Sequence, residues 1–75
     1  MNTEKKENWL IAVGHGWGVI DGICSEQEAE EMRVHKANWE QAPALKIKYK
    51  DFILLKDEEI EKNWAYKMIR DFLQI

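Results

Sequence analysis

Apolar and basic residues alternate strictly between positions 45 and 50, and this pattern constrains the fold more than any other stretch. The alternation sets three apolar side chains against three basic ones: Leu45, Ile47 and Tyr49 against Lys46, Lys48 and Lys50. A period of two is typical of a β-strand with one buried and one solvated face. The chain must therefore build a sheet, and another layer must cover the apolar face of that sheet.

A glycine-rich segment separates two apolar runs near the N-terminus. Residues 9–13 suit a strand, and Gly14-His15-Gly16 follows with two glycines that can adopt the positive φ angles of a tight reversal. A second arm would span residues 17–24. We predict a β-hairpin here, with one bent strand as the alternative. The polar residues 1–8 are predicted to be a tail, and a single α+β domain is predicted to span residues 9–75.

Two stretches carry the signals of helix starts. Ser25 and Glu28 match a capping box, which predicts a helix that begins at Glu26 and ends before Pro43. Asp57 is a second N-cap residue and predicts a final helix. The apolar residues after it recur every four positions, as expected of one amphipathic helix: Ile60, Trp64, Met68 and Phe72. Ile69 and Leu73 widen this predicted stripe.

The run Phe-Ile-Leu-Leu at residues 52–55 is continuously apolar, and we interpret it as a fourth, buried strand. The predicted order of elements is then ββαββα. Each ββα unit leaves a sheet face that it cannot bury alone. We therefore predict the α+β class, with one antiparallel four-stranded sheet and two helices packed on one of its faces.

Charge and hydropathy argue against two classes of partner. The chain carries 11 basic and 14 acidic residues, for a formal net charge of −3, so nucleic acid is not expected as a partner. The alternative is a nucleic-acid-associated regulator that uses the strand with Lys46, Lys48 and Lys50. The strongly apolar residues 9–13 are far fewer than the roughly 20 that span a bilayer, so no membrane partner is predicted.

Three potential metal ligands lie on different predicted elements: His15, Cys24 and His35. No two of them share the short spacing that preorganises a metal site, so neither a metal nor another cofactor is predicted. A lone cysteine cannot form an intrachain disulfide, which favours the reducing cytoplasm. The Gly14-His15-Gly16 turn is an alternative site for a small ligand, because backbone N–H groups and an imidazole could meet an anion there.

Four tryptophans are more than a core of this size can bury with every indole N–H satisfied. Trp64 is assigned to the core, whereas Trp17 and Trp39 are predicted to anchor a partner. Acidic residues beyond the capping positions of the two helices are predicted to dock on a basic surface: Glu30, Glu31 and Glu61. His15, at the turn, completes the set of interaction candidates.

The sequence holds no recognisable catalytic set, so we predict a non-enzymatic interaction or regulatory protein. Such a protein would bind, and could inhibit, a larger macromolecular partner. In its small size, acidity and tryptophan content, the chain resembles in general style the inhibitors that phages and other mobile elements make against host enzymes. Small domains often gain stability from a second surface, and a homodimer is therefore also predicted.

Overall fold

The computed structural model describes residues 5–75 and contains a three-stranded antiparallel sheet in the order β2-β1-β3. β1 (Glu7–Val13) is the central strand, and β2 (Gly18–Cys24) and β3 (Ala44–Lys48) form the two edges. Every side chain from Trp9 to Val13 is buried. Because neighbouring side chains of a strand point to opposite faces, both faces of the sheet must be covered along β1.

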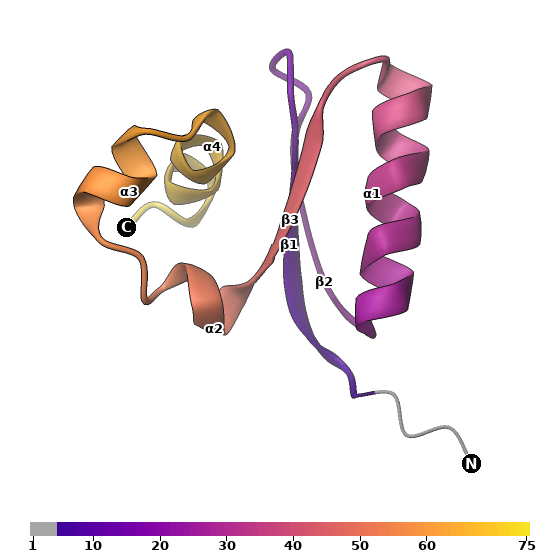
Figure 1. Cartoon of the computed structure of the whole chain (residues 1–75), viewed down its shortest axis with the longest axis horizontal. Coiled ribbons are helices and arrows are strands. Elements are labelled where there is room, and N and C mark those ends of the chain that lie inside the picture. Colours follow the sequence, from indigo (N-terminus) through magenta and orange to yellow (C-terminus); the bar gives the residue numbers. More distant parts are fainter. Residues whose placement is uncertain (1–4) are drawn as a thin grey trace.

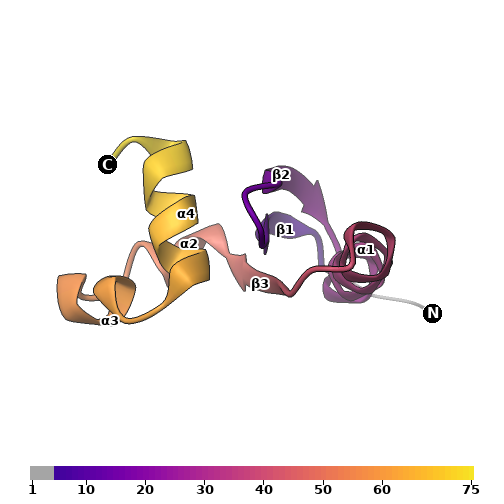
Figure 2. The ribbon, with the colours of Figure 1, turned by 90° about the horizontal axis from the view of Figure 1, so that it is seen from above.

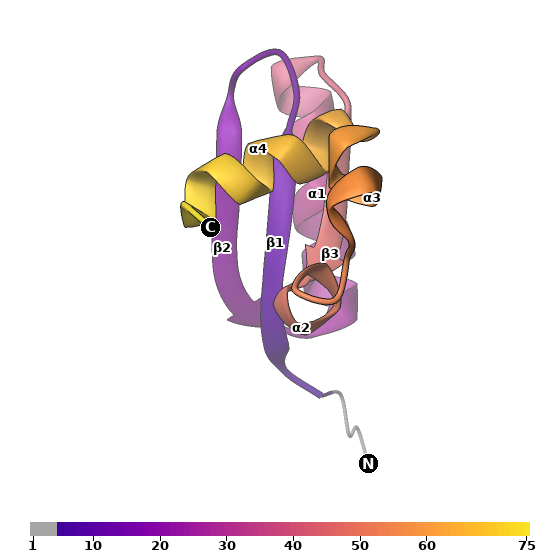
Figure 3. The same ribbon diagram turned by 90° about the vertical axis from the view of Figure 1, so that its left-hand side faces the viewer.

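Helices provide this cover on both sides. α1 (Glu26–Glu40) packs against β1 and β3 on one face. The chain then places α2 (Tyr49–Phe52), α3 (Asp57–Glu61) and α4 (Trp64–Leu73) on the opposite face (Figures 1 and 2). α4 crosses β1 and ends over β2 (Figure 3). The sheet is therefore the middle of three layers.

The core consequently consists of two clusters that share β1. One cluster lies between the sheet and α2–α4, and its buried members are Leu10, Ala12, Phe52, Ile60, Ala65 and Ile69. The other lies on the face of β1 that carries α1, and its buried members are Ile11, Val13 and Ala42. Alternate residues of one strand thus serve two separate packing interfaces.

The predicted four-stranded sheet with both helices on one face is wrong. Residues 52–55 do not form a strand, because Phe52 ends the short helix α2 and Ile53 and Leu54 are exposed after it. α2 turns the chain away from the edge of the sheet directly after β3. Of the apolar run, Phe52 is then buried in the core, and Leu55 packs partly buried against the same cluster.

The single predicted C-terminal helix is also wrong, because the chain breaks it into α3 and α4. The Asn63 side chain accepts hydrogen bonds from the backbone N–H groups of Ala65 (2.8 Å) and Tyr66 (3.4 Å) and so starts a new helix. Of the predicted stripe, Ile60 and Ile69 are buried and Met68 and Leu73 pack against the core. Trp64 and Phe72 are instead exposed (40% and 47%), so Trp64 does not belong to the core, and Ala65 is buried although it lies outside the stripe.

Other predictions are confirmed. β1 and β2 form an antiparallel hairpin in which Glu7 lies opposite Cys24 and Val13 lies opposite Gly18. The Ser25 hydroxyl accepts from the Glu28 N–H (3.1 Å), and the Glu28 carboxylate accepts from the Ser25 N–H (2.9 Å), so the capping box is present. Of the predicted tail, residues 1–4 lie outside the described residues, whereas residues 7 and 8 belong to β1.

Candidate interaction surface

The turn between β1 and β2 holds Trp17 against α1. His15 and Gly16 have φ angles of 58° and 78°, which gives the tight reversal that the glycines predict. The turn is anchored at its base, because the Gly14 N–H donates to the Pro43 carbonyl (2.7 Å). A Cβ on Gly14 would lie 2.9 Å from Cγ of Pro43, so this close approach requires glycine. The turn therefore has a defined place rather than projecting freely.

Lys36 of α1 connects the helix to this turn. Its ammonium nitrogen lies 4.3 Å from the centroid of the Trp17 ring, which is the geometry of a cation–π interaction. Trp17 is 43% exposed, so one part of its indole rests on the helix and the rest faces solvent. The contact orients the indole without burying it.

Trp39 lies one turn further along α1 and is 75% exposed. Its ring stacks against His35, four residues earlier, with a centroid separation of 6.3 Å and an interplanar angle of 19°. Lys36 is three residues before Trp39 and therefore neighbours it on the helix surface. We define Trp17, His35, Lys36 and Trp39 as the tryptophan patch.

The three predicted acidic docking residues lie in different surroundings. Glu31 is exposed, sits four residues before His35 on the same side of α1, and accepts a hydrogen bond from the Gln27 amide (3.4 Å). Glu30 instead accepts two hydrogen bonds from Arg33 (2.9 and 2.6 Å). These bonds lower the pKa of Glu30 to about 2.

Glu61 is on α3, across the sheet from α1. It accepts a hydrogen bond from Arg70 (2.7 Å), which lowers the pKa of the Glu61 carboxyl. The fold thus brings Trp17, Trp39 and Glu31 to one side of α1. Glu30 and Glu61 instead form ion pairs within the chain, with Arg33 and Arg70 respectively.

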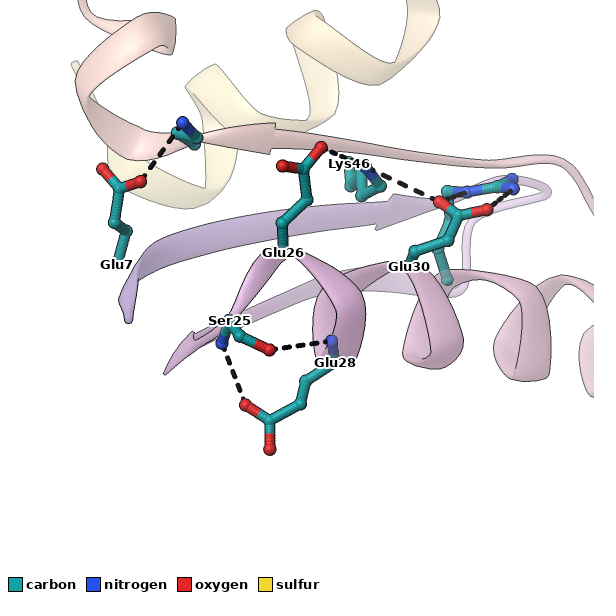
Figure 4. A network of polar contacts seen from close by, with 8 residues as sticks. Glu7, Ser25, Glu26, Glu28, Glu30 and Lys46 are labelled. Atoms are coloured by element: carbon teal, nitrogen blue, oxygen red, sulfur yellow. Dashed lines mark hydrogen bonds and ion pairs between the residues drawn. The ribbon is translucent and has the colours of Figure 1, made fainter. Parts of the chain in front are cut away.

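The lysines of the alternating strand do not form an open basic stripe. The Lys46 ammonium lies 3.8 Å from Glu26 and 3.6 Å from Glu30, and it also lies 4.9 Å from the centroid of the Trp9 ring (Figure 4). Lys46 is therefore enclosed between β3, α1 and the indole of β1. Its charge is matched by carboxylates of the same chain.

Glu7 forms ion pairs with the other two lysines. Its carboxylate oxygens lie 3.1 Å from the Lys48 ammonium and 2.9 Å from that of Lys50, which is on α2 rather than on the strand. Hydrogen bonds from Lys50 and Lys48 lower the pKa of Glu7. A phosphate group at these cations would meet the negative charge of Glu7 beside it.

The three potential metal ligands are not brought together. His15 is at the exposed turn, and His35 is stacked on Trp39. Cys24 ends β2, where burial raises the pKa of its thiol. In residues 5–75, no group of three or more His, Cys, Asp or Glu side chains is placed to hold a metal ion.

Two open hollows occur elsewhere on the surface. One has a volume of about 250 Å³ and is lined by residues of α2–α4 and their connections: Phe52, Ile53, Leu55, Asp57, Ile60, Arg70 and Ile75. The other has a volume of about 390 Å³ and is lined by polar residues: Lys5, Glu7, Glu26, Gln27 and Lys48. Neither hollow includes a histidine or the cysteine, and neither touches the tryptophan patch.

Both indoles of the patch are apparent from the sequence, but the residues that orient them are not. The spacing of His35 and Trp39, four positions apart on one helix, is the signal that could have paired them. The contact between Lys36 and Trp17 has no such signal. It joins residues 19 positions apart and depends on how α1 packs on the hairpin.

No protein-family model matches the chain, and no curated protein or solved structure matches it either. Within the part of the chain that the structure describes, no helix has the length and apolar character needed to cross a bilayer. The chemistry of the tryptophan patch therefore carries the functional argument.

Proposed function

We propose that the chain is a non-catalytic binding protein that docks on a larger protein through the tryptophan patch. The observation that carries this proposal is a pair of exposed indoles, Trp39 (75% exposed) and Trp17 (43%), that contact the adjacent α1 residues His35 and Lys36. Tryptophan is the residue most enriched at the energetic centres of protein interfaces. By covering a site on its partner, such a protein would regulate or inhibit that partner.

The patch is preorganised for binding. The stacking of Trp39 on His35 and the contact of Trp17 with Lys36 restrict both rings before a partner arrives. Side chains that are already ordered lose less conformational entropy when they are buried in an interface. The burial of apolar indole surface then contributes to affinity.

The charge beside the patch favours one orientation of the partner. Among residues 5–75, Glu31 has no ion pair, and it lies on the same row of α1 as His35 and Trp39. A basic group of the partner would meet Glu31 while Trp39 enters an apolar pocket. Glu30 and Glu61 have no part in this docking, because Arg33 and Arg70 engage them.

The two alternative functions have less support. A nucleic-acid-associated regulator would need the cations of Lys46 and Lys48, which already contact carboxylates of the chain. A ligand site at the turn would rest on His15 alone, in a hairpin turn with no hollow beside it among the two described above. A cytoplasmic location stays part of this proposal, because a lone thiol at Cys24 suits a reducing compartment.

The test is affinity capture from the source cells, followed by purification of the captured protein and measurement of its dissociation constant. Trp39→Ala and Trp17→Ala are expected to weaken binding by tenfold or more, mainly through faster dissociation. Leu54→Ala is the matched control, because Leu54 is exposed to a similar degree (78%) but belongs to the connection between α2 and α3, two helices on the opposite side of the sheet from α1. It should leave the dissociation constant within about twofold.

Charge reversal at Glu31 tests the electrostatic part separately. Glu31→Lys is expected to slow association at low salt, and the difference from wild type should shrink as salt screens the attraction. Glu61→Lys is its control on the opposite face. The proposal fails if both tryptophan variants bind the purified partner as tightly as the wild type does.

A further inference from the structure

We propose that a second copy of this chain pairs antiparallel along β2, with Asp21 facing the partner's Asp21, so that two sheets join into one. β2 is an edge strand of seven residues, and its outer side carries no strand within the described part of the chain. Unpaired N–H and C=O groups along such an edge are a template for another strand. The paired residues belong to β2 and are not members of the tryptophan patch, although Trp17 directly precedes this strand.

The register identifies which backbone groups of β2 point outward. The Gly14 N–H donates to the Pro43 carbonyl, so the backbone groups of Gly14 point towards β3. The backbone groups of successive residues in a strand point in alternate directions, so every second residue of β1 counted back from Gly14 also points its N–H and C=O groups towards β3. The residues between them, including Val13 and Ile11, point these groups towards β2. Val13 lies opposite Gly18 and Ile11 opposite Ile20. The residues of β2 between these inward-facing positions therefore direct their N–H and C=O groups to the free edge: Val19, Asp21 and Ile23.

This outward set is self-complementary. When two copies of β2 pair antiparallel about Asp21, Val19 of each copy lies opposite the partner's Ile23 on the face that carries α4. All three outward residues find hydrogen-bonding partners in this register. Registers shifted by two residues pair fewer of them, so the arrangement centred on Asp21 uses the edge most fully.

The apolar surface beside the edge fits the same occupant. Ile23 is 75% exposed although it lies within a strand, and pairing would cover it with Val19 of the second copy. α4 ends over β2, and its last turn carries the exposed Phe72 (Figure 3). A strand added along β2 would lie beside the end of this helix and would shield more apolar surface.

The opposite edge of the sheet is closed to such pairing. On β3, the Ala44 carbonyl points outward and accepts a hydrogen bond from Arg33 of α1 (3.2 Å). Lys46 and Lys48 follow along the same edge, and lysines are a common means of preventing strand addition. Association through β2 alone is isologous and therefore ends at a dimer.

Asp21 provides the specific test of this register, because it is the only charged residue of β2 and would lie opposite the Asp21 of the second copy. Like charges directly opposite one another weaken strand pairing. Asp21→Asn is therefore expected to tighten the dimer by about two- to fivefold in sedimentation equilibrium. A mixture of wild type and D21K should form heterodimers about threefold or more tighter than either homodimer.

A matched pair of charge insertions tests the location. Ile23→Lys places a charge on the proposed interface, and Leu54→Lys places one on a side chain of nearly equal exposure (75% and 78%) away from it. Ile23→Lys should weaken the dimer at least tenfold, and Leu54→Lys should not change it. Circular dichroism of both variants checks that the fold is retained, since neither side chain is buried in the monomer.

The proposal is overturned if wild type and D21N both give a monomer mass at millimolar concentration. It is equally overturned if Ile23→Lys leaves the dimer intact or if the wild type and D21K show no preference for each other. A failure here leaves the tryptophan patch untouched, because the variants in β2 and those at Trp17 and Trp39 are measured against different binding partners.

Discussion

Replacing Ile69 by alanine is expected to destabilise the protein far more than replacing Phe72 by alanine, three residues further along α4. Ile69 is fully buried (0% exposed) against β1 and α2, whereas Phe72 is 47% exposed. The four-residue stripe in the sequence gives the opposite ranking, because it places Phe72 at the core and treats Ile69 as secondary. The pair of variants therefore tests how α4 packs on the sheet.

The magnitudes follow from burial. Ile69→Ala removes three carbon atoms at about 0.8 kcal/mol each, and the remaining cavity adds about 1 kcal/mol, for a total of about 3.5 kcal/mol. Phe72→Ala removes a side chain that is about half buried and leaves no enclosed cavity, so its expected effect is about 1 kcal/mol. A domain of 75 residues has a total stability of about 4–11 kcal/mol, so Ile69→Ala consumes a large part of it.

The assay is urea denaturation followed by circular dichroism at low protein concentration, where association does not contribute. With an m-value of about 1 kcal/mol per molar urea, Ile69→Ala shifts the midpoint down by about 3.5 M. Ile69→Val, which removes one carbon, should shift it by about 1 M and keeps the series measurable if the alanine variant does not fold. A larger loss for Phe72→Ala than for Ile69→Ala would refute the packing of α4 described above.

Three further variants test single contacts by the same assay. Ser25→Ala removes the capping hydroxyl of α1 and is expected to lower the free energy of unfolding by about 1 kcal/mol; no change would mean that the capping box does not stabilise α1. Gly14→Ala places a Cβ against Pro43 and should destabilise by about 1 kcal/mol or more, whereas Gly22→Ala meets no atom within 4 Å and should stay within about 0.5 kcal/mol; equal effects would contradict the turn geometry. The pKa of Glu30 is lowered from 4.5 to about 2 in the folded protein, so its ionised form stabilises the fold above pH 4.5 and this contribution is lost as the pH falls towards 2. The difference in stability between wild type and Glu30→Gln should therefore shrink over that range, and a constant difference down to pH 2 would show that the Glu30 ion pairs do not act.

Local signals in the sequence predicted local structure correctly. The capping box of Ser25 and Glu28 depends on residues three positions apart, and the helix that it predicts is present. The alternation after Ala44 and the glycines of the first turn likewise produced a strand and a hairpin. In each case, the residues that make the contacts are close together in the chain.

The apolar run at residues 52–55 failed as a predictor because its pattern has no unique period. A short apolar run fits a buried strand or a short helix equally well by periodicity. Tertiary packing decides between the two structures, because Phe52 is buried in the same core cluster as Leu10 whereas Ile53 and Leu54 are exposed. The length of the run, residues 52–55, also fits either a strand or a short helix.

The stripe in the last helix failed for a geometric reason. A helix turns by about 100° per residue, so residues four apart drift by about 40° at each step, and a row of four such residues winds around the helix rather than facing one neighbour. Asn63 then interrupts the row and restarts the helix at Trp64. The buried face is the one with Ala65 and Ile69.

The sequence by itself determined the elements of the hairpin, α1 and β3, because their capping, turn and alternation signals act between near neighbours in the chain. The continuous apolar residues from Trp9 to Val13 also indicated a strand with both faces covered, in contrast to the predicted arrangement with both helices on one face of the sheet. Only the tertiary structure decided that α1 and α4 lie on opposite faces. It also decided that Lys36 reaches Trp17, that carboxylates pair with the lysines, and that no strand of residues 5–75 pairs with the outer edge of β2. Those outcomes join residues far apart in the chain, and their energies depend on the packing of whole layers.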